Sequence, residues 1–147
     1  MFNTVLVAVD GSENSKKALN VACHLVKQED NATLHILHIP ESLSHDTVLV
    51  WGIGAIPMEA SSKQVTAAGR KVVEGAKAEA QENGDFKIET HVEQGDPSRL
   101  ILNKARDLGV EAIVLGSRGL GGFGGLIMGS VSHKVTHNAK STVITVR

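Results

Sequence analysis

The sequence predicts an α/β fold: a five-stranded, parallel, doubly wound sheet in the order 3-2-1-4-5, with helices on both faces. Three observations predict it. Short apolar, β-branched runs alternate with longer segments of helical period, the pattern of repeated βαβ units. The first run, 4–9, is continuously apolar, as expected of a central strand buried on both faces. A glycine-rich stretch, 116–129, follows the fourth run and precedes a helix. A length of 147 residues fits one domain over 1–147.

The same patterns place each element in chain order. Strands are expected at 4–9, 33–39, 86–92, 111–115 and 142–146. Helices are expected from Ser12 to about residue 29, and at 57–83, 97–109 and 130–139.

Local signals support the ends of these helices. Ser12 and Ser15 offer N-caps for the first helix, and Asp96 followed by Pro97 is a helix start with the acid as N-cap. Gly84 is placed as the C′ residue of the second helix, and Gly109 ends the third. Right-handed crossovers between parallel strands then permit the order 3-2-1-4-5.

In that order the direction in which successive strands are added to the sheet reverses between the first and fourth strands. Open α/β sheets bind ligands beyond the carboxyl ends of the strands at this switch point. The two loops that flank it are 10–12, read Asp-Gly-Ser, and the glycine-rich stretch 116–129. Topology and composition therefore indicate the same region.

The glycine-rich stretch, GSRGLGGFGGLIMG, contains 7 of the 15 glycines of the chain. A strand, a glycine-rich loop and a helix N-terminus together aim backbone N–H groups at a shared anion. Arg118 adds a guanidinium suited to phosphate oxygens, and Ser130 and Ser132 add hydroxyls at the helix start. The stretch is therefore interpreted as a phosphate cradle for a nucleotide. Two alternatives remain open: a plain flexible connector, and Ser130 as an ordinary N-cap. The stretch is not a Walker A sequence.

Composition argues against several other classes of protein. A formal charge of −1, a pI near 6.6 and the absence of Tyr disfavour a nucleic-acid partner. No apolar run reaches the roughly 20 residues needed to cross a membrane, and no signal peptide is expected. The single cysteine, Cys23, lies on an apolar helical face, where a packed core thiol is expected. It fits a reducing compartment, and the cytoplasm is the expected location.

With Asp10-Gly-Ser at the first strand and the glycine loop at the fourth, the chain resembles the universal stress protein family. The signature is glycine, two residues, glycine, nine residues, then glycine and Ser/Thr, here Gly116, Gly119 and Gly129-Ser130. The resemblance covers the whole chain. It implies a fold of the adenine nucleotide alpha hydrolase-like type, a homodimer paired through strand 142–146, and the ATP-binding, universal stress protein A-like branch. Many members have a proline before the last strand, where this chain has 139–142, Ala-Lys-Ser-Thr.

The resemblance also implies a set of nucleotide contacts. Asp10 would meet the adenosine part, the backbone of Ile39 would pair with adenine, and Ala8 and Leu115 would line the nucleoside. The matched ribose and phosphate contacts are Gly116, Arg118, Gly119, Gly129, Ser130, Val131 and Ser132. Mg²⁺ would be held through the phosphates.

Three functions follow as hypotheses. The first is an ATP-binding regulatory protein of the stress response, read by a protein partner that the sequence does not identify. The second is a slow Mg²⁺-dependent ATPase or self-phosphorylating enzyme, although no catalytic base or water-positioning residue is evident. The third, a flavin or electron-transfer module, is disfavoured by the loop signature.

Two histidine pairs are considered as metal sites and set aside. His133 and His137 have the i, i+4 spacing of a chelating pair but are expected to be solvated. His35 and His38 lie three positions apart on a strand and so do not share a face. No metal site formed by the protein is expected.

The stretch 48–56, VLVWGIGAI, lacks charged and polar side chains although it lies between a strand and a helix. It contains Trp51, the only tryptophan of the chain. Two hypotheses are equally open: a flap near the nucleotide that becomes more ordered with ATP, and a fixed apolar contact.

Overall fold

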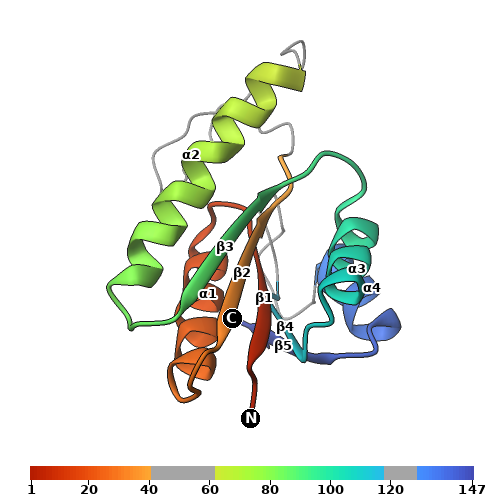
Figure 1. The fold of residues 1–147 in the computed structure, drawn as a ribbon. Coiled ribbons are helices and arrows are strands. Elements are labelled where there is room, and N and C mark those ends of the chain that lie inside the picture. The colour runs from red at the N-terminus through yellow and green to blue at the C-terminus, as the bar shows by residue number, and fades with distance from the viewer. Residues whose placement is uncertain (41–61, 118–128) are drawn as a thin grey trace.

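Five parallel strands form one sheet in the order β3-β2-β1-β4-β5, which confirms the predicted fold class and strand order (Figure 1). The computed structural model describes residues 1–40, 62–117 and 129–147. The strands are β1 (Thr4–Val9), β2 (Thr33–His38), β3 (Lys87–Val92), β4 (Ala112–Gly116) and β5 (Thr142–Val146). All five lie within a residue or two of the predicted ranges.

Four described helices cover the two faces of this sheet. They are α1 (Glu13–Lys27), α2 (Ser62–Gln81), α3 (Pro97–Leu108) and α4 (Ser130–Asn138). Figure 1 shows α1 and α2 on one face and α3 and α4 on the other. The result is three layers, as expected when right-handed crossovers change from one face of the sheet to the other where the strand order reverses. None of these helices is long and apolar enough to cross a membrane.

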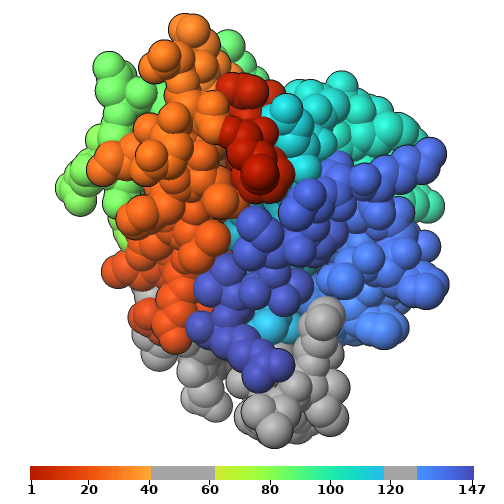
Figure 2. All heavy atoms as spheres, turned by 90° about the horizontal axis from the view of Figure 1, so that it is seen from below, coloured from red at the N-terminus to blue at the C-terminus, as the bar shows by residue number. Residues whose placement is uncertain are grey.

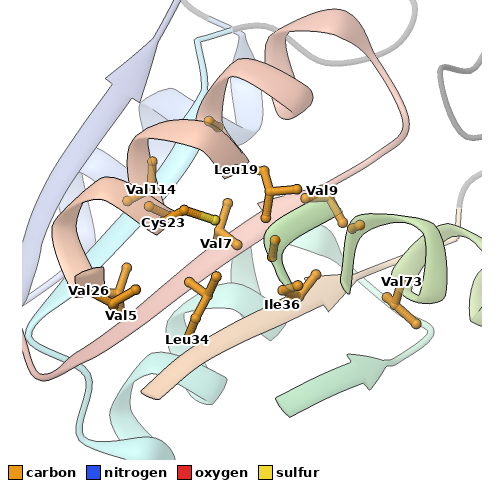
Figure 3. Close-up of a cluster of buried hydrophobic side chains, with 14 of the residues drawn as sticks. Val5, Val7, Val9, Leu19, Cys23, Val26, Leu34, Ile36, Val73 and Val114 are labelled. Atoms are coloured by element: carbon orange, nitrogen blue, oxygen red, sulfur yellow. The ribbon is translucent and has the colours of Figure 1, made fainter. Parts of the chain in front are cut away.

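Each face of the sheet has its own apolar core. Between the sheet and α1 and α2, Val5, Val7 and Leu34 are fully buried together with Leu19 and Cys23 of α1 (Figure 3). On the face of α3 and α4, the buried cluster is Leu6, Leu37, Ile39, Ile101, Ala105, Val110, Ile113, Leu115 and Val135. The successive strand residues of β1 thus point into different cores, which explains its continuous apolar run.

The predicted helix starts are confirmed at α1 and α3. Ser12 is the N-cap of α1, and its Oγ accepts from the Ser15 backbone N–H at 3.2 Å. Asp96 is the N-cap of α3, and its Oδ2 accepts from the Arg99 backbone N–H at 3.0 Å. Gly109 ends α3 with φ 63°, a left-handed conformation in which glycine carries no steric penalty.

Two expectations for helix ends are wrong. Gly84 is not among the positive-φ glycines, so it does not form the left-handed C′ turn expected of it. Instead α2 ends at Gln81, and the N–H groups of Glu82 and Asn83 bond back three residues to close a tighter turn. At α4 the N-cap is Gly129 and Ser130 is the first helical residue, so the alternative in which Ser130 is an ordinary N-cap is wrong.

The other limits of the helices differ by smaller amounts. Helix α1 ends at Lys27, two residues before the expected end, and α4 ends at Asn138. The predicted start of the second helix, at 57–61, lies outside the described residues, and so does the apolar stretch 48–56.

Helix α2 lies very close to the carboxyl ends of β2 and β3. A Cβ built on Gly69 would be 2.8 Å from Val92 Cγ1 and 3.2 Å from both His38 Cδ2 and Pro40 Cγ. Beyond β3, the amide of Gln94 donates to the Ser62 carbonyl at 3.0 Å, at the start of α2. A glycine at the crossing therefore lets the helix approach the sheet beside the end of β2.

Candidate functional site

The two segments that the sequence indicates as a ligand site, 10–12 and 116–129, follow neighbouring strands at one edge of the sheet. Strands β1 and β4 pair in parallel, with Val7 opposite Val114. Asp10 follows the last residue of β1, and Gly116 is the last residue of β4. Because carboxyl ends of paired parallel strands meet at the same edge, Asp10 and the start of the glycine-rich stretch lie beside each other.

The two ends of the glycine-rich stretch are joined by hydrogen bonds. The Gly129 N–H donates to the Ser117 carbonyl at 2.6 Å, and the Ser117 N–H donates to the Val146 carbonyl at 2.7 Å. The buried hydroxyl of Ser132 donates to the Gly116 carbonyl, also at 2.6 Å. The base of the stretch is thus attached to β5 and to the first turn of α4. Arg118 and Gly119 lie outside the described residues.

The N-terminus of α4 faces this base. Gly129 has no side chain to cap the helix, and the first bond within the helix is from the His133 N–H to the Gly129 carbonyl at 2.9 Å. The N–H groups of Ser130, Val131 and Ser132 precede that bond, so the ladder of the helix leaves them without an intrahelical acceptor. With no acidic residue in this first turn, the positive end of the helix dipole carries no negative side chain.

On the other side of the switch point, Asp10 is held in a turn. Its Oδ1 accepts from the Ser12 backbone N–H at 2.9 Å, two residues on, and the same Ser12 caps α1. The carboxylate of Asp10 is part-buried and directly follows the sheet. The turn therefore holds the Asp10 carboxylate in one position at the end of β1, where a ligand could contact it.

His38 supports the same edge and was not identified as a site residue from the sequence. Its ring Nδ1 donates to the Val9 carbonyl at 2.8 Å, immediately before Asp10. Burial is the main cause that lowers the pKa of this ring, so it is neutral at pH 7. Both histidines of β2 are buried and lie on opposite faces, as expected from their spacing. A histidine that ends a buried strand could have indicated this positioning role.

The three apolar residues predicted to meet the nucleoside fall in one cluster. Leu115 and Ile39 are buried in the core on the face of α3 and α4, and Ala8 packs against it. Ile39 follows the last residue of β2, and its side chain is 8% exposed. Its side chain is therefore committed to the core, which leaves its backbone as the group that could pair with a base.

The predictions for the remaining polar groups have separate outcomes. Cys23 is fully buried in the core beneath α1, as expected. His133 and His137 are exposed on α4, as expected, with their rings stacked at a centroid distance of 6.4 Å.

The sequence of the chain matches known proteins along its whole length. The model of the universal stress protein family matches residues 1–147. Universal stress protein YxiE of Bacillus subtilis is 42% identical over 150 residues, which span 100% of both chains.

Solved structures agree in fold. A universal stress protein in complex with cAMP has a TM-score of 0.69 at 24% identity, covering 99% of this chain and 97% of its own. A universal stress protein from Archaeoglobus fulgidus in complex with dAMP has a TM-score of 0.66 at 18% identity, covering 98% and 97%. Some proteins of this fold therefore bind nucleotides. With its full-length family match and its 42% identical relative, the chain belongs to the universal stress protein family.

Proposed function

We propose that the chain binds ATP with Mg²⁺ at the carboxyl ends of β1 and β4 and acts as a nucleotide-dependent regulatory protein. The observation that carries the proposal is the base of the glycine-rich stretch. Gly116 and Gly129, the outer glycines of the family signature, are brought together there through the Gly129–Ser117 and Ser132–Gly116 hydrogen bonds. The two ends of a signature that spans 15 residues of sequence thus lie close together.

The phosphates would lie against the first turn of α4. Backbone N–H groups of Ser130, Val131 and Ser132 and the helix dipole favour an anion at this position. Arg118 and Gly119 of the signature would complete the cradle. Because the Ser132 hydroxyl proton is donated to the Gly116 carbonyl, its side chain would contribute an accepting oxygen or rotate to donate to phosphate.

The nucleoside would lie on the side of β1 and β2. Asp10 would accept from a ribose hydroxyl or the adenine amino group, and the backbone of Ile39 would pair with the base. Ala8 and Leu115 would supply apolar contact from the ends of the two central strands. The neighbouring structures with cAMP and dAMP support an adenine nucleotide at this fold.

Mg²⁺ would be carried by the phosphates. This ion takes oxygen ligands, keeps several waters and is commonly bound through substrate phosphates with few protein carboxylates. The hydroxyl of Ser130, exposed at the start of α4, and the carboxylate of Asp10 are hard oxygen donors at this edge. That donor set suits a metal that arrives with its nucleotide.

The proposal is tested first at the glycines. Gly129 has φ −63° and ψ 158°, which a β-branched residue adopts without strain, so Gly129→Val should fold while its side chain obstructs the phosphates. Gly119→Val in the same chain adds a second side chain to the proposed cradle. We expect calorimetric ATP affinity to fall, with Gly129→Ala as the graded control between wild type and valine. Undiminished ATP affinity in the double variant would refute the cradle.

A second test separates nucleoside from phosphate contacts. Asp10→Ala should weaken ATP and adenosine by similar factors, on the order of tenfold for one lost charged hydrogen bond. Asp10→Asn keeps the size of the side chain and tests the charge alone. A loss confined to ATP would contradict the placement of Asp10 at the nucleoside.

Turnover distinguishes regulation from catalysis. A regulatory protein should hold ATP with little hydrolysis, whereas an enzyme should exceed about 1 s⁻¹, near the low end of ordinary turnover numbers. Identifying the nucleotide that copurifies, by denaturation and chromatography, tests the ligand directly.

We also propose that two copies pair through β5. Among the described strands β5 pairs only with β4, and Figure 2 shows the C-terminal segment on the surface between α1 and α4. A bare edge strand exposes a row of backbone groups that a second copy can satisfy. Thr145→Lys should shift the mass measured by light scattering toward the monomer. His137→Lys adds the same charge on exposed α4 and should leave the mass unchanged.

The proposed setting is the cytoplasm. Support comes from the single, fully buried thiol of Cys23, which leaves no partner for a disulfide within the chain. The 1–147 unit is proposed to act as one domain, with a protein partner that reads its nucleotide state.

A further inference from the structure

Three metal-ligating side chains gather on the sheet at its β3 edge, away from the carboxyl ends of β1 and β4. They are His35 of β2 and Glu89 and His91 of β3. His35 is directly opposite Glu89 in the register of the two strands, and Leu37 is opposite His91. Since alternate residues share a face, all three side chains lie on the face of α3 and α4.

The distances between their polar atoms suit one small metal ion. His35 Nδ1 is 3.1 Å from His91 Nε2 and 3.4 Å from Glu89 Oε2. The three ligand atoms all lie within 4.8 Å of one another. Ligands about 2.0–2.1 Å from a tetrahedral Zn²⁺ are about 3.4 Å apart. Small side-chain rotations would therefore bring all three atoms to one ion.

We propose that His35 Nδ1, His91 Nε2 and Glu89 Oε2 bind one borderline divalent transition metal ion of the Zn²⁺ class. Two imidazoles and one carboxylate are a ligand set that such ions take, while Mg²⁺ and Ca²⁺ require mainly oxygen. Glu89 and His91 are half-buried at the edge of the sheet, so the fourth position faces solvent and is filled by water.

The orientation of the carboxylate ligand favours binding. The ammonium of Lys87 holds Glu89 Oε1 at 2.8 Å, which leaves Oε2 directed at His35. A partner of this kind fixes the rotamer of a ligating carboxylate.

Two ammonium groups near the cluster act against the ion. Lys87 of β3 pairs with Glu89, and Lys104 of α3 pairs with Glu93. The positive charges of both act on His35, and that of Lys104 also acts on His91, so they repel a dication. Lys104 does not hold a ligand, so removing its ammonium should tighten metal binding.

The competing explanation is a hydrogen bond between two neutral histidines. The rings of His35 and His91 are 5.3 Å apart between centroids and tilted by 32°, so one ring N–H can donate to the other ring nitrogen. That bond would occupy the same two nitrogens. Zinc and the His–His hydrogen bond are therefore mutually exclusive, and a titration can tell them apart.

The experiment uses the full chain after chelator treatment, titrated with Co²⁺ and with Zn²⁺. We expect saturable binding of one ion per chain, with Co²⁺ giving the intense visible bands of tetrahedral coordination, and Zn²⁺ displacing it. Glu89→Gln and His91→Gln preserve side-chain size and should each weaken binding at least about tenfold, since even outer-shell losses cost 10–100-fold. Lys104→Met should strengthen it.

The matched control is the exposed pair on α4. His133 and His137 can capture transition metals loosely because of their i, i+4 spacing, so His133→Gln with His137→Gln should leave the one-ion titration unchanged. Absence of saturable binding by the wild-type chain overturns the proposal. It is equally overturned if Glu89→Gln and His91→Gln bind as the wild type does, or if only the α4 variant loses the ion. Circular dichroism confirms that each variant is folded.

Discussion

Replacing Gly69 by alanine tests how closely α2 must approach the sheet. In an open helical position this change should stabilise the protein by up to about 1 kcal/mol, because alanine has the higher helix propensity. At Gly69 the new Cβ would be 2.8 Å from Val92 Cγ1. Carbon atoms pack at about 3.5–4.0 Å, so roughly 0.7 Å of overlap must be relieved.

The neighbours of Gly69 cannot move away easily. Val92 is β-branched with a stiff χ1, and the ring of Pro40 and the buried His38 are each 3.2 Å from the same Cβ. Overpacking of this kind costs about 1–3 kcal/mol. Against the gain in propensity, we expect Gly69→Ala to destabilise the chain by about 1 kcal/mol.

Urea unfolding followed by circular dichroism measures this free energy. Ala78→Gly, at an exposed position of the same helix, measures the propensity difference alone and should cost about 1 kcal/mol. In a Val92→Ala background the Gly69→Ala change should become less destabilising. If Gly69→Ala instead stabilises the chain by as much as Ala78→Gly destabilises it, the close approach of α2 is refuted.

Three further predictions concern other contacts. Burial, then the charge of Glu79, raises the pKa of the Cys23 thiol from 9.0 to about 12. The free energy of unfolding should therefore fall between pH 9 and 12, where only the unfolded chain loses this proton. A thiol reagent at pH 8 should label Cys23 only in urea, and rapid labelling of the native protein would contradict this. Hydrogen bonds from the Arg99 N–H and the Ser98 hydroxyl lower the pKa of Asp96. Asp96→Ala should therefore lower the urea midpoint at pH 7, and the difference between wild type and variant should shrink as the pH falls below the ordinary value of 3.8. A difference that stays constant with pH would exclude the ionised cap. Ser132→Ala leaves the Gly116 carbonyl without its 2.6 Å donor and should cost about 1–2 kcal/mol in urea unfolding; an unchanged midpoint would show that water replaces the hydroxyl.

The parts of the fold that the sequence predicted are those governed by local pattern. Continuous apolar runs marked the strands, and Asp96 with Pro97 marked the start of α3, because the backbone requirements there are met by neighbouring residues. The C-terminus of α2 and the N-cap of α4 were not predicted correctly. After α2 the backbone turns through bonds from the Glu82 and Asn83 N–H groups to carbonyls three residues back, so no left-handed glycine is needed at Gly84.

The candidate nucleotide site was predictable only in part. Spacing identified Gly116 and Gly129, but the bond that joins the Gly129 N–H to the Ser117 carbonyl depends on where β4 and α4 lie in space. The support that His38 gives to β1 likewise depends on strand pairing.

The histidine–carboxylate cluster shows the same limit. His35 was compared with His38 on its own strand, whereas its partners Glu89 and His91 are more than 50 residues away in the sequence. Two ligands alternating along β3 were a visible signal. Their approach to His35 is set by the β2–β3 register, which no short-range pattern encodes.

The closure of the glycine-rich stretch at Ser117 and Gly129 bears on how such a protein can change over evolutionary time. A hydrogen bond joins the residues on either side of the 11 residues between them. Substitutions or insertions among those 11 residues therefore need not disturb β4, β5 or α4. Doubling the length of a flexible loop adds only about 0.6 kcal/mol of closure cost. A lineage could therefore change the sequence and length of the glycine-rich stretch, and gain or lose a ligand, while the rest of the fold stays the same.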